Sequence, residues 1–166
     1  DNLGASAEKG EDEEVETDVL VIGMGASGSV AALKAAESGA KVLGVEATEA
    51  LGGFGNAAQG MFAVGSVEQD ERYGTDAETD EEYWYNHMTS HNNNLGNSKL
   101  VREFVAEAKN TVSYMLNHGV KFFLSPTAQQ IAHFDTEVVY HRWNGADPFT
   151  YIGQYLDENG VEIRYN

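Results

Sequence analysis

Residues 23–28, Gly-Met-Gly-Ala-Ser-Gly, have the glycine spacing of a dinucleotide-binding turn. They directly follow Val19–Ile22, a continuous apolar run typical of a strand that is buried on both faces. A helix is predicted from Ala26 to Ser38. A turn without bulky side chains lets a pyrophosphate lie against the backbone, and the free N–H groups and positive dipole of the helix start attract its charge. The candidate phosphate-binding residues are Gly23, Gly25, Ala26, Ser27 and Gly28.

Glu46 is an acidic residue at the end of the second predicted strand, 41–45. A carboxylate about 20 residues after such glycines can accept hydrogen bonds from both hydroxyl groups of an adenosine ribose. It also repels a 2′-phosphate, which disfavours a phosphorylated nicotinamide cofactor. The alternative is a β-α-β unit that binds no phosphate and carries an ordinary surface glutamate. The agreement of strand, glycines, helix, strand and acid favours the dinucleotide site.

A second glycine-rich segment follows at 47–62. Five of its sixteen positions are glycine or asparagine, and four more are alanine. A segment with so few large side chains, placed just after the nucleotide turn, can lie flat against a bound ligand. The alternative is a plain flexible loop.

The charge of the chain is strongly negative and unevenly placed. The 166 residues carry a formal net charge of −17, with seven acidic residues in 1–16 and eight in 68–82. Nucleic acid and anionic membrane surfaces repel such a chain, so neither is an expected partner. Without cysteine the chain has no disulfide, thiol catalyst or cysteine-bound metal. No apolar run approaches the roughly 18 residues of a membrane span, and residues 1–16 are predicted to be a disordered tail.

The middle of the chain predicts an acidic loop at 66–80 and then a helix. Thr79 and Glu82 have the spacing of a capping box that opens this helix. His87 and His91 are four residues apart and share one helix face, but no third ligand accompanies them, so we expect no metal site.

A long amphipathic helix follows a loop at 92–97. Ser98 is expected to cap it, and His118-Gly119 to end it. Its apolar residues recur at three-and-four spacing, which predicts a stripe that packs into the core rather than a cofactor surface. The stripe consists of Leu100, Val101, Phe104, Val105, Ala108, Val112, Met115 and Leu116.

Two extended segments are predicted beyond this helix, at 120–124 and 134–143. Within the second, His141 and Arg142 are polar residues that we expect near the mouth of the site. The alternative is a solvent-facing edge strand, in which the two side chains would simply point into water.

A helix and a strand complete the chain. Asp147 as N-cap and Pro148 as first helical residue predict a helix that runs to about Glu158. Alternating apolar residues over 161–165 predict a strand. Because a new strand normally pairs and leads onward, we interpret the sheet as incomplete. An open sheet edge and apolar helix faces would favour self-association.

The sequence from Thr17 to Asn166 resembles the amino-terminal part of FAD-dependent oxidoreductases of the fumarate reductase and succinate dehydrogenase flavoprotein type. That group includes enoate and urocanate reductases and ketosteroid dehydrogenases. Three segments carry the resemblance: the turn at 23–28 with Glu46, Gly-Gly at 52–53 followed by Ala-Ala-Gln-Gly at 57–60, and the helix and turn at 98–122. The similarity covers nearly all of the chain but only the beginning of a typical family member.

The resemblance implies an α/β fold: a Rossmann-like FAD/NAD(P)-binding three-layer architecture over 17–166, with an incomplete parallel sheet and extra helices. Members with covalently attached flavin have a histidine near the position of Phe54, so FAD is expected to bind here non-covalently. Members often have a lysine or arginine where this chain has Ala47, which implies one missing phosphate or adenine contact. The residues implied to lie beside FAD in this part of the chain are Ala47, Gly52, Gly53, Phe54, Gly55, Asn56, Ala58, Gln59 and Gly60.

The resemblance also implies an activity for the complete enzyme, hydride transfer from reduced flavin to an activated C=C bond of a small unsaturated substrate. In the family, the residues that bind substrate and deliver the proton lie in a capping domain and in later parts of the flavin domain. No catalytic residue is therefore assigned, and the chain alone is expected to be inactive. Its expected partners are the remainder of the enzyme as a separate chain, or a second copy of itself. The alternatives are a fragment of an NAD-dependent dehydrogenase and a non-catalytic module for nucleotide binding or assembly.

Overall fold

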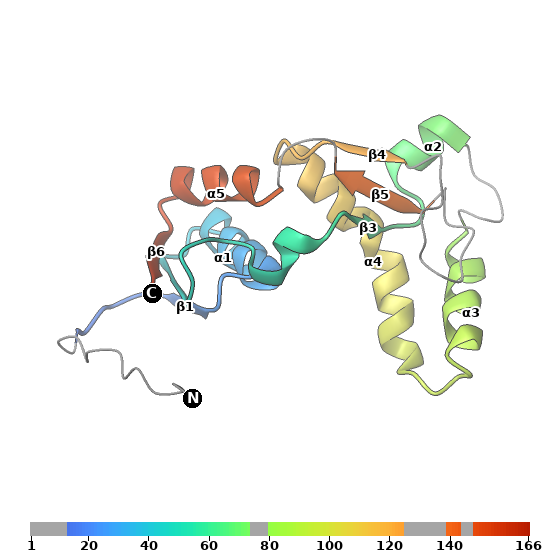
Figure 1. Cartoon of the computed structure of the whole chain (residues 1–166), viewed down its shortest axis with the longest axis horizontal. Helices are drawn as coiled ribbons and strands as arrows, with labels where there is room; N and C mark the ends of the chain where they lie inside the picture. The colour runs from blue at the N-terminus through green and yellow to red at the C-terminus, as the bar shows by residue number, and fades with distance from the viewer. Residues whose placement is uncertain (1–12, 74–79, 125–138, 144–147) are drawn as a thin grey trace, which may run out of the picture.

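The computed structural model describes residues 13–73, 80–124, 139–143 and 148–166. A parallel sheet with two helices lies at one end of the molecule, and a small antiparallel sheet with three helices lies at the other (Figure 1). In chain order the elements are β1 (Val19–Ile22), α1 (Ala26–Glu37), β2 (Val42–Glu46), the 3-10 helix η1 (Gly53–Ala57), β3 (Gly60–Phe62), α2 (Val67–Tyr73), α3 (Glu81–His91), α4 (Ser98–Asn117), β4 (Phe122–Leu124), β5 (Tyr140–Trp143), α5 (Pro148–Glu158) and β6 (Glu162–Tyr165).

The parallel sheet confirms the β-α-β prediction and the predicted last helix and strand. Its strand order is β1-β2-β6, with Val19 opposite Val42 and Leu43 opposite Glu162. Helices α1 and α5 pack side by side against it. On the other face of β1, Leu20 is 51% exposed and Ile22 is 81% exposed. Among the described residues, no strand pairs with the outer edge of β1, so the parallel sheet is small, as expected.

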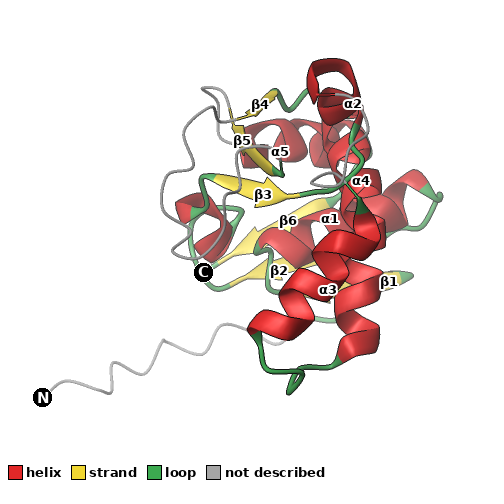
Figure 2. Cartoon of the chain, turned by 90° about the vertical axis from the view of Figure 1, so that its right-hand side faces the viewer, coloured by secondary structure: helices red, strands yellow, loops and turns green. Residues whose placement is uncertain are grey.

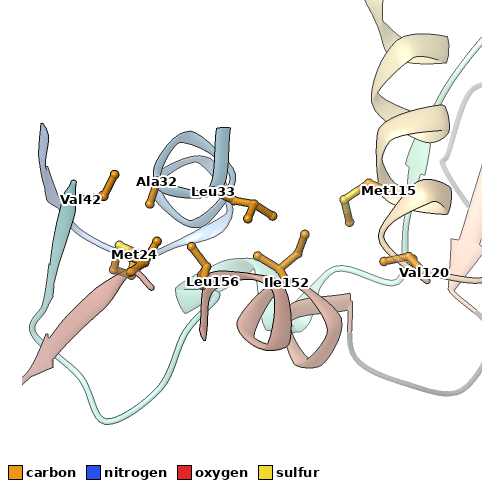
Figure 3. Packing of buried hydrophobic residues seen from close by; sticks show 9 residues of the cluster. Met24, Ala32, Leu33, Val42, Met115, Val120, Ile152 and Leu156 are labelled. Carbon is orange, nitrogen blue, oxygen red and sulfur yellow. The ribbon is translucent and has the colours of Figure 1, made fainter. Parts of the chain in front are cut away.

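The core of this end lies between the sheet and the two helices (Figure 3). Leu33 from α1 meets Ile152 and Leu156 from α5, and all three side chains are fully buried. Burying each such side chain contributes roughly 1.5–3 kcal/mol. Met115 and Val120 join the same cluster from the end of α4, so the core connects the two ends of the molecule.

The antiparallel sheet has the order β3-β5-β4, which places β5 in the middle. The alternative of a solvent-facing edge strand at 134–143 is therefore wrong for its described part. His141 is completely buried, whereas we expected it near the mouth of the site. Its Nε2 lies 2.6 Å from Ser66 Oγ, and its Nδ1 lies 3.2 Å from the carbonyl oxygen of Val139. Burial lowers the pKa of His141 to about 4, so the ring is neutral at pH 7.

Helix α2 occupies part of the segment that we predicted to be an acidic loop. The prediction was wrong because the high charge of the segment hid a helix start at Ser66 and Gln69. Ser66 N donates to Gln69 Oε1 at 3.0 Å, and Gln69 N donates to Ser66 Oγ at 3.3 Å. This reciprocal pair is a capping box, and both side chains are buried.

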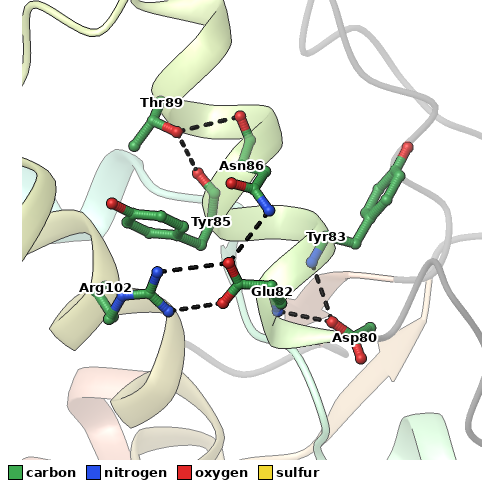
Figure 4. Close-up of polar contacts among 7 residues, drawn as sticks. All are labelled: Asp80, Glu82, Tyr83, Tyr85, Asn86, Thr89 and Arg102. Carbon is green, nitrogen blue, oxygen red and sulfur yellow. Dashed lines mark hydrogen bonds and ion pairs between the residues drawn. The ribbon is translucent and has the colours of Figure 1, made fainter.

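Helices α3 and α4 form an antiparallel hairpin, which Figure 2 shows in the foreground. Asp80 caps α3 by accepting from the N–H groups of Glu82 and Tyr83, at 2.7 and 3.0 Å (Figure 4). The expected capping role of Glu82 is wrong, because its carboxylate pairs instead with Arg102 of α4 at 2.8 Å. Thr79 lies outside the described residues.

The N-cap of helix α4 lies one residue before the predicted one. Asn97, not Ser98, accepts a hydrogen bond from Leu100 N at 3.1 Å. The apolar stripe is buried only along its second half, at Val105, Ala108, Val112 and Met115. At the first half the prediction was wrong, because Leu100 is 62% exposed and Phe104 is 50% exposed. Phe104 stacks on Phe62 with ring centroids 5.6 Å apart, so it lies at the rim of a second core, which is formed by Val64, Trp84, Val105 and Val139.

Several expectations fall outside the described residues. These are the disorder of most of the tail, the extended segment before residue 139, and the N-cap role of Asp147. Glu13, at the start of the described chain, forms an ion pair with Arg164 of β6 at 2.7 Å. The rings of His87 and His91 stack 6.0 Å apart, and the described residues contain no cluster of three side chains suited to hold a metal. Within the same residues, no helix is long and apolar enough to cross a bilayer.

Candidate functional site

The first glycine turn connects β1 to α1 and leaves the start of the helix uncapped. Gly23 N donates to Val45 O at 2.8 Å, which ties the turn to β2. A methyl group added at Gly28 would collide with the carbonyl oxygen of Gly23, so the helix can approach the turn only because residue 28 is glycine. The N-cap, Gly25, provides no side-chain hydrogen bond. The N–H groups of the first helical turn therefore have no side-chain cap, and groups of this kind can bind an anion such as a phosphate.

Glu46 lies directly beside this turn. Its Oε2 accepts from Met24 N at 2.8 Å, and its Oε1 accepts from the N–H and hydroxyl of Thr48, both at 2.9 Å. These bonds, with the Thr48 hydroxyl first and Met24 N–H next, lower the pKa of Glu46. The carboxylate is therefore charged at neutral pH, and a backbone hydrogen bond from Ala47 also contributes to its lowered pKa. The Thr48 hydroxyl contacts Ala50 O at 3.2 Å as well, so it keeps a partner if another hydroxyl group replaces it at Glu46.

The second glycine segment lies against the first turn. Gly52 N donates to Met24 O at 2.8 Å, and Gly25 and Gly52 form a parallel β-bridge. A Cβ atom built on Gly53 would lie 3.4 Å from the Cα atom of Gly25. The two glycine turns and Glu46 therefore meet around Met24, although they are up to 30 residues apart in the chain.

Gly52 and Gly55 differ from the first turn in what occupies the space beside them. Gly52 has φ +92, and a Cβ there would lie 2.6 Å from Cδ2 of Phe149. A Cβ on Gly55 would lie 2.7 Å from Cζ of the same ring. Phe149 belongs to α5 and is only 8% exposed. The ring of Phe149 thus requires glycine at both positions, and at Gly52 a Cβ would also lie 2.5 Å from Oδ1 of Asn56.

The end of the second segment is attached to β5. Trp143 Nε1 donates to Ala58 O at 2.7 Å, and Trp143 N donates to Gln59 O at 3.3 Å. Arg142 contacts the same segment, because its guanidinium donates to Gln59 Oε1 at 3.4 Å. A Cβ on Gly60 would collide with the carbonyl oxygen of His141, so residue 60 also packs closely on β5.

Phe54 and Asn56 lie on η1, between these two attachments. The Phe54 side chain is 94% exposed, an unusual position for a large apolar ring. The Asn56 amide turns back and donates to Leu51 O at 2.7 Å. Asn56 therefore stabilises the segment, and Phe54 is the side chain of η1 that is free to meet a ligand.

Two cavities flank the glycine turns. One, of about 450 Å³, lies at the carboxyl ends of the three parallel strands, where open α/β sheets bind ligands. It is lined by Ile22, Gly23, Val45, Glu46, Ala47, Arg164, Tyr165 and Asn166. The other, of about 340 Å³, is largely apolar and lies at the start of α1; its lining includes Ala26, Ser27, Gly55, Ala58, Gly60, Trp143 and Phe149.

Several of these lining residues were not predicted from the sequence, and the most informative are Arg164, Tyr165, Asn166, Trp143 and Phe149. Arg164, Tyr165 and Asn166 line the larger cavity because β6 pairs with β2. A partial signal was present, since the carboxyl ends of parallel strands lie at the same edge of a sheet, but only the pairing of β6 with β2 places this end beside Glu46. Trp143 and Phe149 carried no comparable signal, because nothing in their spacing links them to residues 52–60.

Comparison with known proteins agrees with this geometry. A family model described as an FAD binding domain matches residues 18–145. The chain is 36% identical over 106 residues to a digoxin reductase of Eggerthella lenta, covering 63% of this chain and 19% of that protein. It is 32% identical over 150 residues to a fumarate reductase (cytochrome) of Shewanella frigidimarina, covering 87% of this chain and 24% of that protein.

A solved structure shares the fold. It is the open conformation of a flavocytochrome c3 fumarate reductase, with a TM-score of 0.71 and 25% sequence identity. The match covers 90% of this chain and 26% of that one. The chain thus spans about a fifth to a quarter of the length of these relatives.

Proposed function

The chain belongs to the FAD binding domain family, and from this premise we propose that its two glycine turns and Glu46 bind FAD non-covalently within a flavin-dependent reductase. The family match favours FAD over the NAD-dependent dehydrogenase that the first glycine turn alone left open. The second glycine segment supports the same choice, because a nicotinamide site needs only the first turn.

Each part of FAD has a matching part of the site. The larger cavity beside Glu46 suits the adenosine, with the carboxylate bonded to the ribose hydroxyls. The uncapped first turn of α1 suits the pyrophosphate. The backbone of 53–60, with the exposed ring of Phe54, suits the ribityl chain and the flavin.

One observation carries the proposal, which is that both glycine turns meet in a single structure. The hydrogen bond from Gly52 N to Met24 O and the bridge between Gly25 and Gly52 bring the segments together. Glu46 is attached to the same Met24 through its N–H group. A ligand with a ribose, two phosphates and a long flavin-bearing chain can contact all three places at once.

For the whole protein we propose the reduction of an activated C=C bond in a small unsaturated substrate. Both relatives named above are reductases, and bound FAD supplies hydride transfer. The residues of this chain bind and orient the cofactor, and we assign no catalytic residue among them. The substrate-binding and proton-donating groups would belong to further domains or to a partner.

The cofactor proposal is tested with the purified 166-residue chain and added FAD. We expect a yellow complex with one FAD per chain, and no comparable binding of NAD. Denaturation should release all of the flavin, because Phe54 cannot form the covalent bond that a histidine at this position forms in related enzymes. Flavin that remains attached after denaturation would contradict non-covalent binding. A chain that carries no flavin after incubation with saturating FAD and removal of the free FAD would contradict the site itself.

The activity proposal needs a second assay. A reduced viologen serves as electron donor, and a panel of unsaturated acids serves as substrates, for this chain and for a longer form of the protein. We expect turnover only by the longer form. Absence of turnover by an FAD-loaded longer form would instead favour a non-catalytic module.

A further inference from the structure

Trp143 forms hydrogen bonds with the part of the second glycine segment that has the fewest anchoring side chains. Residues 57–60 are Ala-Ala-Gln-Gly, so they have almost no side chains that could anchor them. The indole N–H of Trp143 donates to Ala58 O at 2.7 Å, and the backbone N–H of Trp143 donates to Gln59 O at 3.3 Å. Two successive peptide groups of the segment are thus held by one residue of β5.

The anchor itself is rigid. Trp143 is paired in the ladder of the antiparallel sheet, opposite Phe122 of β4, and the two rings pack with centroids 5.4 Å apart. The ring also packs against the core that α1 and α5 share. A donor on a packed ring in a sheet loses little freedom when it forms a hydrogen bond, so it can define the position of the acceptor.

Phe149 packs against the start of the same segment. Its ring fills the space beside Gly52 and Gly55, and both aromatic residues line the 340 Å³ cavity together with Ala58. The segment therefore contacts one aromatic side chain near its start and another near its end.

We propose that Trp143 is a positioning residue for flavin, acting through the peptide groups of Ala58 and Gln59. The inference rests on the proposed function, in which these peptide groups lie along FAD. Trp143 holds their dipoles in one orientation, and this orientation sets both the affinity for FAD and the electrostatic environment of the flavin. Trp143 does not need to touch the cofactor to have this effect.

Trp143→Phe tests the proposal because it removes the N–H donor and keeps an aromatic ring against Phe122. We expect the Kd for FAD to rise about five-fold, the size expected for one hydrogen bond, and the reduction potential of bound flavin to shift. Potentials are measured at saturating FAD, which stabilises the folded chain by mass action. A merely structural role would lower the unfolding midpoint without moving the potential.

Trp84→Phe is the matched control, since the chain has two tryptophans. Trp84 is 3% exposed in the separate core with Val64, Val105 and Val139. We expect this variant to change stability but neither the Kd nor the potential. A Trp143→Phe chain with unchanged Kd and potential, or with the same changes as Trp84→Phe, would overturn the proposal. Failure of the parent chain to bind FAD is a separate result, which would refute the proposed function instead.

Discussion

The two glycine turns are both rich in small residues but differ in what lies beside their glycines. At Gly25 an added Cβ would meet nothing nearer than Gly52 O, at 3.9 Å, and its φ of −68 suits any residue. At Gly52 and Gly55 the same Cβ would enter the ring of Phe149. The first turn is therefore open on the side where a ligand would lie, whereas the second is shaped by the protein.

This difference shows that a glycine-rich sequence can have two physical causes. Where the space at the Cβ position of a glycine is empty, a ligand can occupy it, and substitution should affect binding. Where neighbouring atoms of the protein occupy that space, substitution should affect stability. Gly28 belongs to the second kind although it lies in the first turn, because the backbone of Gly23 occupies its Cβ position.

The largest expected effect is on stability, in Gly28→Ala. The added methyl group would lie 3.0 Å from the carbonyl carbon of Gly23 and still closer to its oxygen, and this backbone cannot shift without breaking its bond to β2. We expect the free energy of unfolding to fall by at least about 3 kcal/mol, measured by urea denaturation. Ala31→Ser, on the exposed face of α1, should change it by less than about 0.5 kcal/mol. Equal stability of the two variants would contradict the close packing of helix and turn.

Gly52→Ala should be the next most harmful change. It combines a positive φ with the overlap against Phe149, so we expect a loss of about 2 kcal/mol in the free energy of unfolding. Adding Phe149→Leu should recover part of this loss, and the double-mutant cycle measures the coupling. Strictly additive effects would mean that Phe149 does not shape the turn.

Gly25→Ala should affect FAD binding rather than stability. We expect the unfolding free energy to stay within about 0.5 kcal/mol of the parent, because the Cβ points into open space. The Kd for FAD should rise roughly 30-fold, since the methyl group occupies the place of a phosphate. Fluorescence titration of FAD measures it. Unchanged binding would show that the two turns do not differ in the way described.

Acid should lower the stability of the folded chain through His141, the buried neighbour of Gly60 in the second turn. Its pKa is about 4 in the folded chain and 6.5 without burial, so protons bind more readily to the unfolded chain between these values. Stability should therefore fall as the pH drops from 7 to 5, by on the order of 1–2 kcal/mol. Urea denaturation at both pH values should show a smaller change for His141→Gln. The same pH dependence in both chains would exclude His141 as its cause.

Glu46→Gln should have a smaller effect on FAD affinity than Gly25→Ala. A neutral amide accepts weaker hydrogen bonds from ribose than a carboxylate does, so we expect the Kd to rise roughly ten-fold. The pKa of Glu46 in the folded chain lies below its ordinary value of 4.5. The hydrogen bonds to the ionised carboxylate therefore persist above pH 4.5, and they are lost as the pH falls through the pKa of the folded chain. Glu49→Gln, on the exposed loop that follows, is the control and should leave the Kd unchanged.

Local sequence was a good guide where one segment supplies all of the evidence. The strand, glycine turn, helix and acid of the first unit occur in the predicted order, and α5 and β6 follow at the predicted places. It failed where two local signals competed. The acidic residues of 66–80 hid the capping pair of Ser66 and Gln69, and Asn97 caps α4 in place of Ser98.

The candidate site divides in the same way. The sequence alone determined that residues 23–28 and Glu46 lie at one turn, because hydrogen bonding and sterics within a β-α-β unit leave few arrangements for them. Only the tertiary structure decided that Phe149 occupies the space beside Gly52 and Gly55, that Trp143 donates a hydrogen bond to Ala58 O, and that His141 is buried. These contacts join residues about 80 to 100 positions apart, and which of them meet depends on how whole elements pack, which local spacing does not encode.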